Sequence, residues 1–295
     1  MTPYHHFVSE LARLVRQGRQ FPLGGFATPS RPVIAADAPR ALIFSPHPDD
    51  ECIIGGLALR LQREAGLRVV NVAVTQGSNK ARQAARWDEL TAACDYLGFD
   101  LVATVPGGLE HVNVKTRAAD PAHWSASVEV IARLLGEHRP ATIFFPHDAD
   151  WNSSHIGTHH LLVDALARQA PAFTCRVVET EFWGAMATPN LMVESSIDDV
   201  AEMMTALSFH VGEVQRNPYH LLVPAWMQDN VRRGGELVGG QGGAAPDFNF
   251  CTLYRLREWR DGALHVVHDG GRALPASIDV RDILAVATPL ARCPD

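Results

Sequence analysis

Short apolar runs alternate with helix-like segments along residues 41–182 of the chain. Five runs have the length and the Val, Ile and Phe content of buried strands, and they span residues 41–45, 69–75, 101–105, 142–145 and 176–182. The segments predicted to be helical lie between them, at residues 53–65, 81–97, 125–138 and 156–169. This alternation predicts an α/β fold, a Rossmann-like three-layer sandwich with a mainly parallel sheet and helices on both faces.

The two ends of the chain lack this alternation. Apolar side chains recur at helical spacing within residues 1–20, and residues 21–40 are rich in Pro, Gly and Ala. The apolar side chains are Phe7, Val8, Leu11, Leu14 and Val15. We expect an N-terminal helix and connecting segment over residues 1–40, and a single domain over residues 41–295 with an irregular C-terminal part. The helix either packs against the domain or forms a contact in a homo-oligomer.

Composition and charge argue against several classes of partner. The chain has 295 residues, a net charge of −7 and no basic stripe, so a nucleic-acid partner is not expected. No run of about 18 apolar residues is present, which argues against a membrane span. The five cysteines stand singly, as in a cytoplasmic protein with reduced thiols.

A glycine-rich stretch occupies residues 234–243. It does not follow a strand and lead into a helix, so it is not a dinucleotide-binding motif. We expect a surface loop or a lid over the active site instead.

Ligand-type residues gather directly behind the first predicted strand. Residues 45–51 have the sequence Ser-Pro-His-Pro-Asp-Asp-Glu, where the chain passes from strand to helix. In open α/β sheets, ligands bind at the carboxyl ends of the strands. His47 and Asp50 can converge on one point in a tight turn, whereas Asp49 should point elsewhere. The turn therefore suits a metal ion with a separate base beside it, and the alternative for His47 and Asp50 is a simple helix cap.

A second cluster follows the predicted strand at residues 142–145. Residues 146–160 contain four histidines and two aspartates. Because parallel strands end at the same edge of a sheet, this cluster should face the first one. One of its histidines could complete a metal site, and His147, His155 and His159 compete for that role.

These motifs resemble those of a known family. Residues 47–51 match the His-Pro-Asp-Asp-Glu signature of the PIG-L/LmbE-like zinc deacetylases, which remove acetyl groups from N-acetylglucosaminyl compounds. Further matches follow in the family's order, over roughly residues 40–255. They are Thr75-Gln76-Gly77, Arg86 with Glu89-Leu90, Leu97-Gly98, His155-Ile156-Gly157-Thr158, Glu181-Phe182-Trp183 and Ala206-Leu207-Ser208-Phe209-His210.

The resemblance implies a site and a reaction. His47, Asp50 and His155 would hold Zn²⁺, or another divalent ion. Zinc lowers the pKa of a bound water and polarises the amide carbonyl, while Asp49 would act as the general base. An N-acetylated amino sugar or its conjugate would release acetate and a free amine. Arg86 would bind the substrate near the site, unless it is only a surface ion-pair residue.

The chain departs from the family at one place. The family's second motif is His-x-Asp-His, whose first histidine helps to stabilise the oxyanion, and this chain has Asn152 at that position. Asn152 can donate a hydrogen bond but cannot carry a positive charge. Loss of one oxyanion donor typically lowers the rate by a factor on the order of 10²–10³. Candidate replacements are His147, His159 and His210, with Asp148 or Asp150 available to orient a histidine.

We therefore expect a cytoplasmic, metal-dependent N-deacetylase that acts on a small N-acetylated sugar-type substrate. Asn152 and His210 are candidate catalytic groups, although His210 is as well explained as a structural histidine. Trp151 is a candidate for stacking on a sugar face. One alternative is an amidase that acts on a thiol-sugar conjugate at the same site. The other is a catalytically impaired binding protein of the same fold, which the substitution at Asn152 keeps open.

Overall fold

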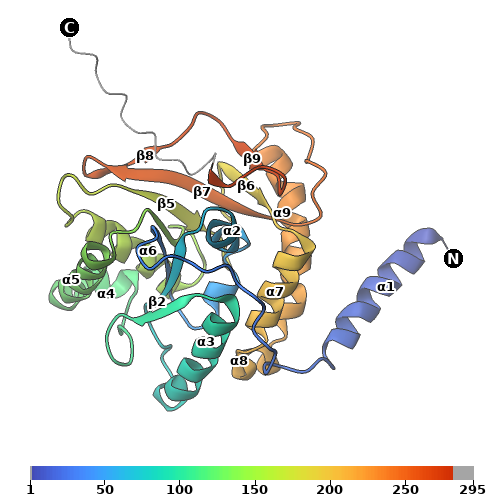
Figure 1. Ribbon diagram of the computed structural model, residues 1–295, viewed down its shortest axis with the longest axis horizontal. Helices are drawn as coiled ribbons and strands as arrows, with labels where there is room; N and C mark the ends of the chain where they lie inside the picture. Colours follow the sequence, from blue (N-terminus) through green and yellow to red (C-terminus); the bar gives the residue numbers. More distant parts are fainter. Residues whose placement is uncertain (1, 282–295) are drawn as a thin grey trace, which may run out of the picture.

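Five parallel strands form the first part of the sheet in the computed structural model, which describes residues 2–281 (Figure 1). They are β1 (Arg40–Ser45), β2 (Arg68–Ala73), β3 (Asp100–Ala103), β4 (Thr142–Pro146) and β5 (Cys175–Thr180). Their order in the sheet is β3-β2-β1-β4-β5, and all neighbours in this part are parallel. The direction of this order reverses between β1 and β4, and ligands of open α/β sheets bind in the crevice at such a reversal.

The last third of the described chain adds an antiparallel part to the sheet. β7 (Cys251–Arg260) pairs with β5 in antiparallel register, with Leu256 opposite Val178. The remaining strands are β6 (Leu191–Glu194), β8 (Ala263–Val266) and β9 (Arg272–Leu274). β7 covers an edge that β5 would otherwise expose. The predicted α/β fold with a mainly parallel sheet is confirmed, and the sheet is mixed because β7 is antiparallel to its neighbours.

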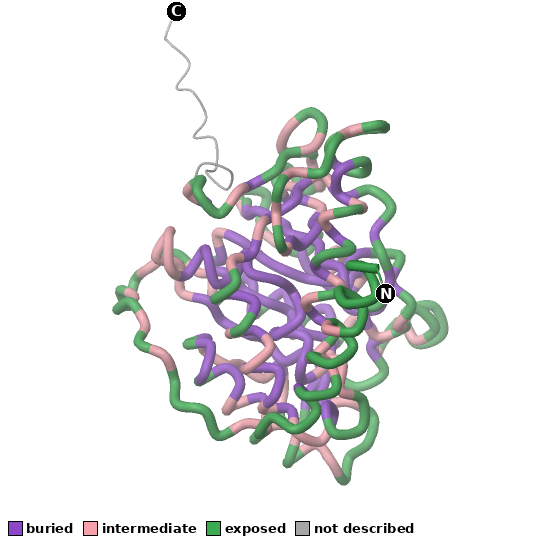
Figure 2. The backbone as a smooth tube through the Cα atoms, turned by 90° about the vertical axis from the view of Figure 1, so that its right-hand side faces the viewer, coloured by how far each residue is buried: buried purple, intermediate pink, exposed green. Residues whose placement is uncertain are grey.

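Helices cover both faces of the sheet, as predicted. Successive side chains of a strand point to opposite faces, so Ile43 belongs to one core and Leu42 to the other. The first core contains residues of α2 (Leu57–Glu64), α3 (Gln83–Leu97), α7 (Ile197–Leu207) and α9 (Val223–Leu237). The second contains residues of α5 (Pro121–His138) and α6 (Ser153–Leu166), and α4 (Val114–Ala119) lies beside these two helices. Figure 2 shows the buried strands between the two helical layers.

The helix predicted from residue 53 begins later, at Leu57. A short 3-10 helix, η1 (Asp50–Cys52), follows β1 instead, and Gly55 then has a backbone φ of +85°. A β-carbon on Gly55 would lie 2.1 Å from Thr252 Oγ1, and the Tyr254 hydroxyl donates a hydrogen bond of 2.5 Å to the Ile54 carbonyl. The C-terminal strand β7 therefore fixes the course of the chain just behind the first turn.

Two segments outside the predicted helices contain helix. The segment between residues 106 and 121 holds α4, whose cap is Asn113: its Oδ1 accepts a hydrogen bond from Thr116 N at 2.9 Å. The first residues of the glycine-rich stretch lie in α9 rather than in a loop. Gly234 is buried there, and an added β-carbon would lie 2.8 Å from Met192 Sδ and 2.9 Å from Leu253 Cδ2.

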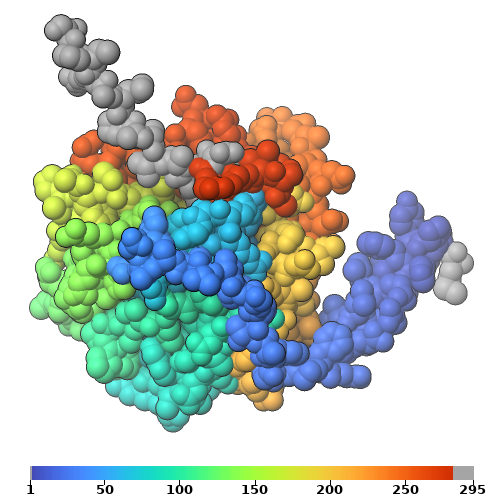
Figure 3. Space-filling view, in the orientation of Figure 1, coloured from blue at the N-terminus to red at the C-terminus, as the bar shows by residue number. Residues whose placement is uncertain are grey.

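The N-terminal helix forms as predicted, as α1 (Pro3–Gly18), and it projects from the body of the molecule (Figures 1 and 3). Its apolar stripe is exposed: 62% of Phe7 and 55% of Leu14 are accessible to solvent. Gly18, at the end of α1, is buried next to the Leu221 side chain. The stripe therefore does not pack against the domain, and the division into residues 1–40 and 41–295 stays a prediction.

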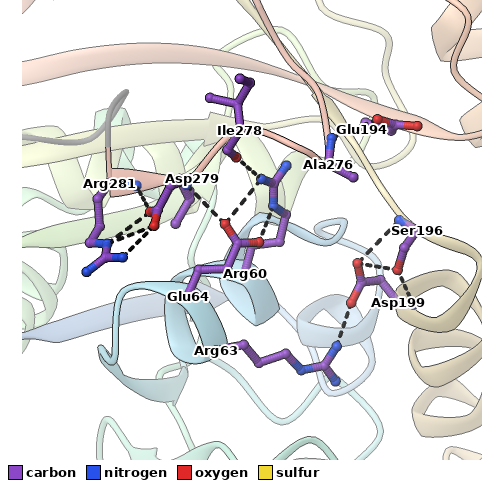
Figure 4. A network of polar contacts seen from close by, with 11 residues as sticks. Arg60, Arg63, Glu64, Glu194, Ser196, Asp199, Ala276, Ile278, Asp279 and Arg281 are labelled. Carbon is purple, nitrogen blue, oxygen red and sulfur yellow. Dashed lines mark hydrogen bonds and ion pairs between the residues drawn. The ribbon is translucent and has the colours of Figure 1, made fainter.

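A network of polar contacts fastens residues 276–281 to α2 (Figure 4). Arg60 donates to Glu64 Oε1 at 2.7 Å and to the Ile278 carbonyl at 2.6 Å. Val280 N donates to Glu64 Oε2 at 3.0 Å, so Glu64 serves both partners. Arg63 on the same helix pairs with Asp199 of α7 at 2.6 Å. These bonds hold α2, which follows the first ligand-rich turn, from two sides.

Among residues 2–281, no helix has the length and apolar character needed to cross a bilayer. The cysteines of this range are buried free thiols, namely Cys52, Cys94, Cys175 and Cys251. Cys293 lies outside the described residues.

Candidate metal centre

The turn after β1 is held by its own backbone and side chains. His47 N donates to Asp50 Oδ2 at 2.8 Å, and Asp49 N donates to Glu51 Oε2 at 3.0 Å. Asp49 has a φ of 112°, a region that non-glycine residues rarely occupy and that costs on the order of 1–3 kcal/mol. Such strain concentrates at functional sites. The two carboxylates have different partners: Asp49 Oδ2 accepts from the Tyr219 hydroxyl, and Asp50 Oδ2 accepts from His47 N.

Three ligand atoms from two neighbouring strand ends converge beside this turn. His47 Nδ1 lies 3.2 Å from His155 Nε2, and each nitrogen lies 3.4 Å from Asp50 Oδ2. His47 and Asp50 follow β1, and His155 lies in the first turn of α6, which follows β4. Two imidazole nitrogens and one carboxylate are a donor set that suits a catalytic divalent ion such as zinc, with room for a further ligand. The residues present therefore fit a metal ion.

Asp150 supports His155 from behind. Its Oδ2 lies 3.7 Å from His155 Nδ1 and accepts hydrogen bonds of 3.2 Å from the backbone N–H groups of Trp183 and Gly184. A carboxylate at the second nitrogen of a ligand histidine fixes the orientation of the ring. Burial lowers the pKa of His155, but the charges of Asp50 and Asp150 outweigh it and raise that pKa to about 10.

Asp49 stands beside the three ligands without joining them. Its Oδ2 accepts a hydrogen bond of 2.5 Å from the Tyr219 hydroxyl, which comes from η3 (Tyr219–Leu222). Burial, together with the neighbouring Asp50 charge, raises the pKa of Asp49 to about 7. The sequence carries no signal for Tyr219, because the contact joins residues 170 positions apart.

A second buried group lies behind Asp49. His210 Nε2 lies 2.7 Å from Glu51 Oε1, and the same oxygen accepts a hydrogen bond of 3.1 Å from the Cys52 thiol. Burial lowers the pKa of His210 and the Glu51 charge raises it, with a net shift upward. Burial raises the pKa of Cys52 well above its usual value, which keeps the thiol protonated. His210 therefore contacts Glu51 rather than the three ligand atoms.

Other residues singled out in the sequence have different surroundings. Arg86 donates from Nη2 to the Pro48 carbonyl at 2.8 Å, which places it against the ligand-bearing turn. Asn152 caps α6, because its Oδ1 accepts a hydrogen bond from Ser154 N at 2.8 Å. Trp151 is 82% exposed.

Two histidines that competed with His155 face away from the ligand atoms. His147 Nε2 lies 2.8 Å from the Gly184 carbonyl oxygen. His159 Nδ1 lies 3.1 Å from the Pro146 carbonyl oxygen and 3.3 Å from Glu179 Oε1. The structure thus brings His47, Asp49, Asp50 and His155 together, and it leaves His147 and His159 outside the group.

Two hollows lie near the candidate metal centre, one with His47 in its wall and one lined by residues that contact His155 and Asp49. A polar hollow of about 480 Å³ has His47 and Ser154 in its wall, together with Thr75, Gln83 and Asn113. An apolar hollow of about 230 Å³ is lined by Phe182, Trp183, Tyr219 and their neighbours. Sequence reasoning identified neither hollow.

The fold and this site define an α/β protein with a candidate metal centre at the reversal point of its sheet. Residues 42–166 match the PIG-L family, described as GlcNAc-PI de-N-acetylase. A 1D-myo-inositol 2-acetamido-2-deoxy-alpha-D-glucopyranoside deacetylase from Mycobacterium sp. (strain KMS) is 27% identical over 209 residues, covering 59% of this chain and 68% of that protein. Over residues 42–166, the chain is therefore similar to PIG-L/LmbE family proteins of the N-acetylglucosaminyl deacetylase-like type.

Solved structures share the fold at low sequence identity. The N,N'-diacetylchitobiose deacetylase from Pyrococcus horikoshii has a TM-score of 0.53 and 16% identity, covering 87% of this chain and 93% of that one. A 4-carboxy-2-hydroxymuconate hydratase from Pseudomonas putida KT2440 also has a TM-score of 0.53, with 18% identity, covering 74% of this chain and 95% of that one. Because these two proteins have different named activities, the shared fold alone does not identify the reaction.

Proposed function

We propose that this protein is a metal-dependent N-deacetylase that hydrolyses an N-acetylated amino sugar or its conjugate to acetate and a free amine. The observation that carries the proposal is the convergence of His47, Asp50 and His155, with Asp49 beside them. The named activities of the mycobacterial and Pyrococcus proteins support the same substrate class.

The chain supplies three ligands and a base. A divalent ion such as Zn²⁺, when bound, lowers the pKa of a water molecule and polarises the carbonyl oxygen of the amide. Asp49 accepts a proton from the water as its oxygen bonds to the carbonyl carbon. Asp49 then returns that proton to the amide nitrogen as the C–N bond breaks, which gives the carboxylic acid and the amine.

The residues around Asp49 and His155 hold these groups in place. Tyr219 donates to Asp49 Oδ2, which leaves Oδ1 for the proton transfer. Asp150 faces His155 Nδ1 and so presents the opposite nitrogen, Nε2, toward His47 and Asp50. Arg86 steadies the turn through the Pro48 carbonyl.

The polar hollow is the proposed place for the sugar. It adjoins His47 and carries hydroxyl, amide and charged groups that can bond sugar hydroxyls, among them Ser78, Lys80 and Glu110. Trp151 would take part only from the exposed surface beside the second cluster.

The first test is metal content and acetate release measured together. Wild type, Asp49→Asn and the exposed control Asp88→Asn would be loaded with zinc and assayed on N-acetylglucosaminides. We expect about one zinc per chain in all three proteins. Acetate release by Asp49→Asn should fall by a factor on the order of 10²–10⁴, with no change in the control. An Asp49→Asn protein as active as wild type would contradict the proposal.

The substitution at Asn152 supports a second candidate, a binding protein that retains the fold without turnover. The Asn152 side-chain oxygen, Oδ1, accepts a hydrogen bond from Ser154 N and so caps α6. The Asn152 side chain cannot supply a positive charge to an oxyanion. Zinc binding without hydrolysis of any amide in a broad panel would favour this candidate. Turnover confined to thiol-sugar conjugates would favour the amidase instead.

A further inference from the structure

The apolar hollow beside Tyr219 has no part in the mechanism above. Its volume is about 230 Å³, and its wall is formed by Ile53, Phe182, Trp183, Tyr219, Val223 and Trp226. Among residues 2–281, no charged side chain lines it. The Tyr219 hydroxyl is already bonded to Asp49, so the wall offers little to a sugar hydroxyl.

The inner wall of the hollow belongs to the candidate metal centre itself. The Phe182 ring meets the His155 ring edge-on, with centroids 4.8 Å apart. Tyr219 contacts Asp49, and Ile53 follows directly after η1, which contains Asp50. A group in this hollow would therefore contact Phe182 and Tyr219, the side chains that touch His155 and Asp49.

The two hollows differ in the side chains that line them. The polar hollow has His47 in its wall and side chains that can bond a sugar. The wall of the apolar hollow includes Phe182 and Tyr219, which contact His155 and Asp49, and it is suited to burying hydrocarbon. An N-acyl amino sugar has two parts on either side of the scissile C–N bond, a polar amine part and an acyl part. The rim residues Trp183 and Leu222 are 44% and 51% exposed, so a chain longer than the hollow can extend outward.

We propose that the apolar hollow receives the acyl group of the substrate, and that this group is an unbranched or aromatic acyl chain longer than acetyl. The inference rests on the proposed amide hydrolysis and specifies its substrate. The reaction is unchanged: water adds to the acyl carbon, the C–N bond breaks, and the fatty or aryl carboxylic acid leaves with the free amine. Each methylene buried in the hollow should raise kcat/KM by about threefold to fourfold.

The test is a series of N-acylglucosamines with acetyl, butanoyl, hexanoyl and octanoyl groups, assayed with the zinc-loaded protein. We expect kcat/KM for the hexanoyl compound to exceed that for the acetyl compound by at least about tenfold. In Trp226→Ala, the ratio of octanoyl to acetyl kcat/KM should fall by about fivefold or more. Trp87→Ala is the matched control, because Trp87 lies in a different hollow, beside Pro106, and should leave that ratio unchanged.

Two further measurements keep the inference testable. Leu222→Glu, at the exposed rim, places a carboxylate at the mouth and should lower the same ratio even if Trp226→Ala does not fold. Octanoate should change the tryptophan fluorescence of the wild type at concentrations at least about tenfold lower than butanoate does, with or without zinc. In Trp87→Ala, octanoate and butanoate should change the fluorescence at the same concentrations as in the wild type.

The outcomes separate this inference from the proposed function. Acetate release with a flat or falling acyl series would overturn the inference and leave the deacetylase standing. A rise with the alkyl length of N-acetylglucosamine octyl glycosides, but not with the acyl group, would assign the hollow to an aglycone and overturn it as well. Zinc binding with no hydrolysis of any acyl compound would reject the proposed function, and the inference with it.

Discussion

The two strand ends that form the candidate metal centre differ in how their ligand-type residues are used. After β1, His47, Asp49, Asp50 and Glu51 all belong to one connected cluster. After β4, residues 146–160 contain four histidines, and His155 is the one that lies with His47 and Asp50. The first segment is a turn whose geometry is set by bonds between residues two or three positions apart. The second segment enters a helix, so the burial of each residue depends on what packs against α6. A dense run of ligand-type residues is therefore informative only where local bonds fix its shape.

The largest expected effect comes from comparing two histidines of the second segment, one at the ligand atoms and one away from them. His155→Ala should weaken zinc binding by much more than about 100-fold. Loss of a residue that only supports a ligand typically weakens metal binding by about 10- to 100-fold, and loss of a ligand itself should cost more. His159→Gln should retain the metal, because His159 faces the Pro146 carbonyl and Glu179 instead. Zinc content after dialysis against a chelator series measures both. Equal loss of zinc in the two variants would show that the second cluster holds the ion by another arrangement.

The next effect concerns the stability of the first turn. Glu51→Gln leaves His210 buried without its charge partner, which should lower the free energy of unfolding by about 3–5 kcal/mol. The pKa of His210 is raised above 6.5 in the folded state. The ion pair therefore contributes fully below about pH 6.5, and its contribution is lost as the pH rises through the folded pKa.

Urea unfolding of Glu51→Gln and wild type at several pH values measures this effect. The difference between the two proteins should be largest near pH 6 and should decline as the pH rises through the raised pKa of His210. Glu129→Gln is the control, because Glu129 is on the surface, where an ion pair contributes about 0–1 kcal/mol. A difference that grows with pH would contradict a charged His210.

A smaller effect on zinc affinity is expected from Asp150, which follows β4 and supports His155. Asp150→Asn retains the acceptor oxygen for the Trp183 and Gly184 N–H groups but loses the charge that faces His155. Zinc affinity should fall by about 10- to 100-fold. Competition with a fluorescent zinc chelator measures it, with Asp148→Asn as the neighbouring control. An unchanged affinity in Asp150→Asn would remove Asp150 from the support of the metal site.

The smallest effect tests whether Asn152 is more than a cap. Asn152→Ala should lower stability by about 1 kcal/mol, within a range of about 0.5–2, because α6 loses its N-cap. Asn152→Asp retains the acceptor and should unfold at the wild-type denaturant concentration. If kcat falls in both variants while only Asn152→Ala loses stability, the amide itself takes part in turnover.

The sequence predicts the parts of the fold that local patterns determine. The alternation of apolar runs identifies β1 to β5, and the motif at residues 47–51 identifies the ligand-bearing turn. The start of α2 was not predicted, because Tyr254 and Thr252 hold the chain near Gly55 from about 200 positions away. The helical setting of Gly234 likewise depends on Met192 and Leu253, which no local pattern reveals.

The candidate site likewise contains residues that local motifs predict and residues that only long-range packing brings to it. The strand-end rule and the family resemblance predict a site that contains His47, Asp49, Asp50 and His155, and the structure brings these four residues together. Tyr219 and Trp226 were not predicted, because their place beside the centre is fixed by the packing of η3 and α9 rather than by spacing. The polar group at Glu51 and His210 was noticed only as separate residues, since 159 positions separate its members.

The late position of β7 has a consequence for the order in which the chain is made. His155 precedes Tyr254 by 99 positions, so a ribosome that adds about 5–20 residues per second produces the metal ligands roughly 5–20 s before β7 is complete. During that interval the β5 edge has no partner and the turn near Gly55 lacks its tether to Tyr254. The nascent chain thus passes through a stage with an open sheet edge, the feature that favours association with other chains. Pairing of residues 251–260 with β5 closes that edge.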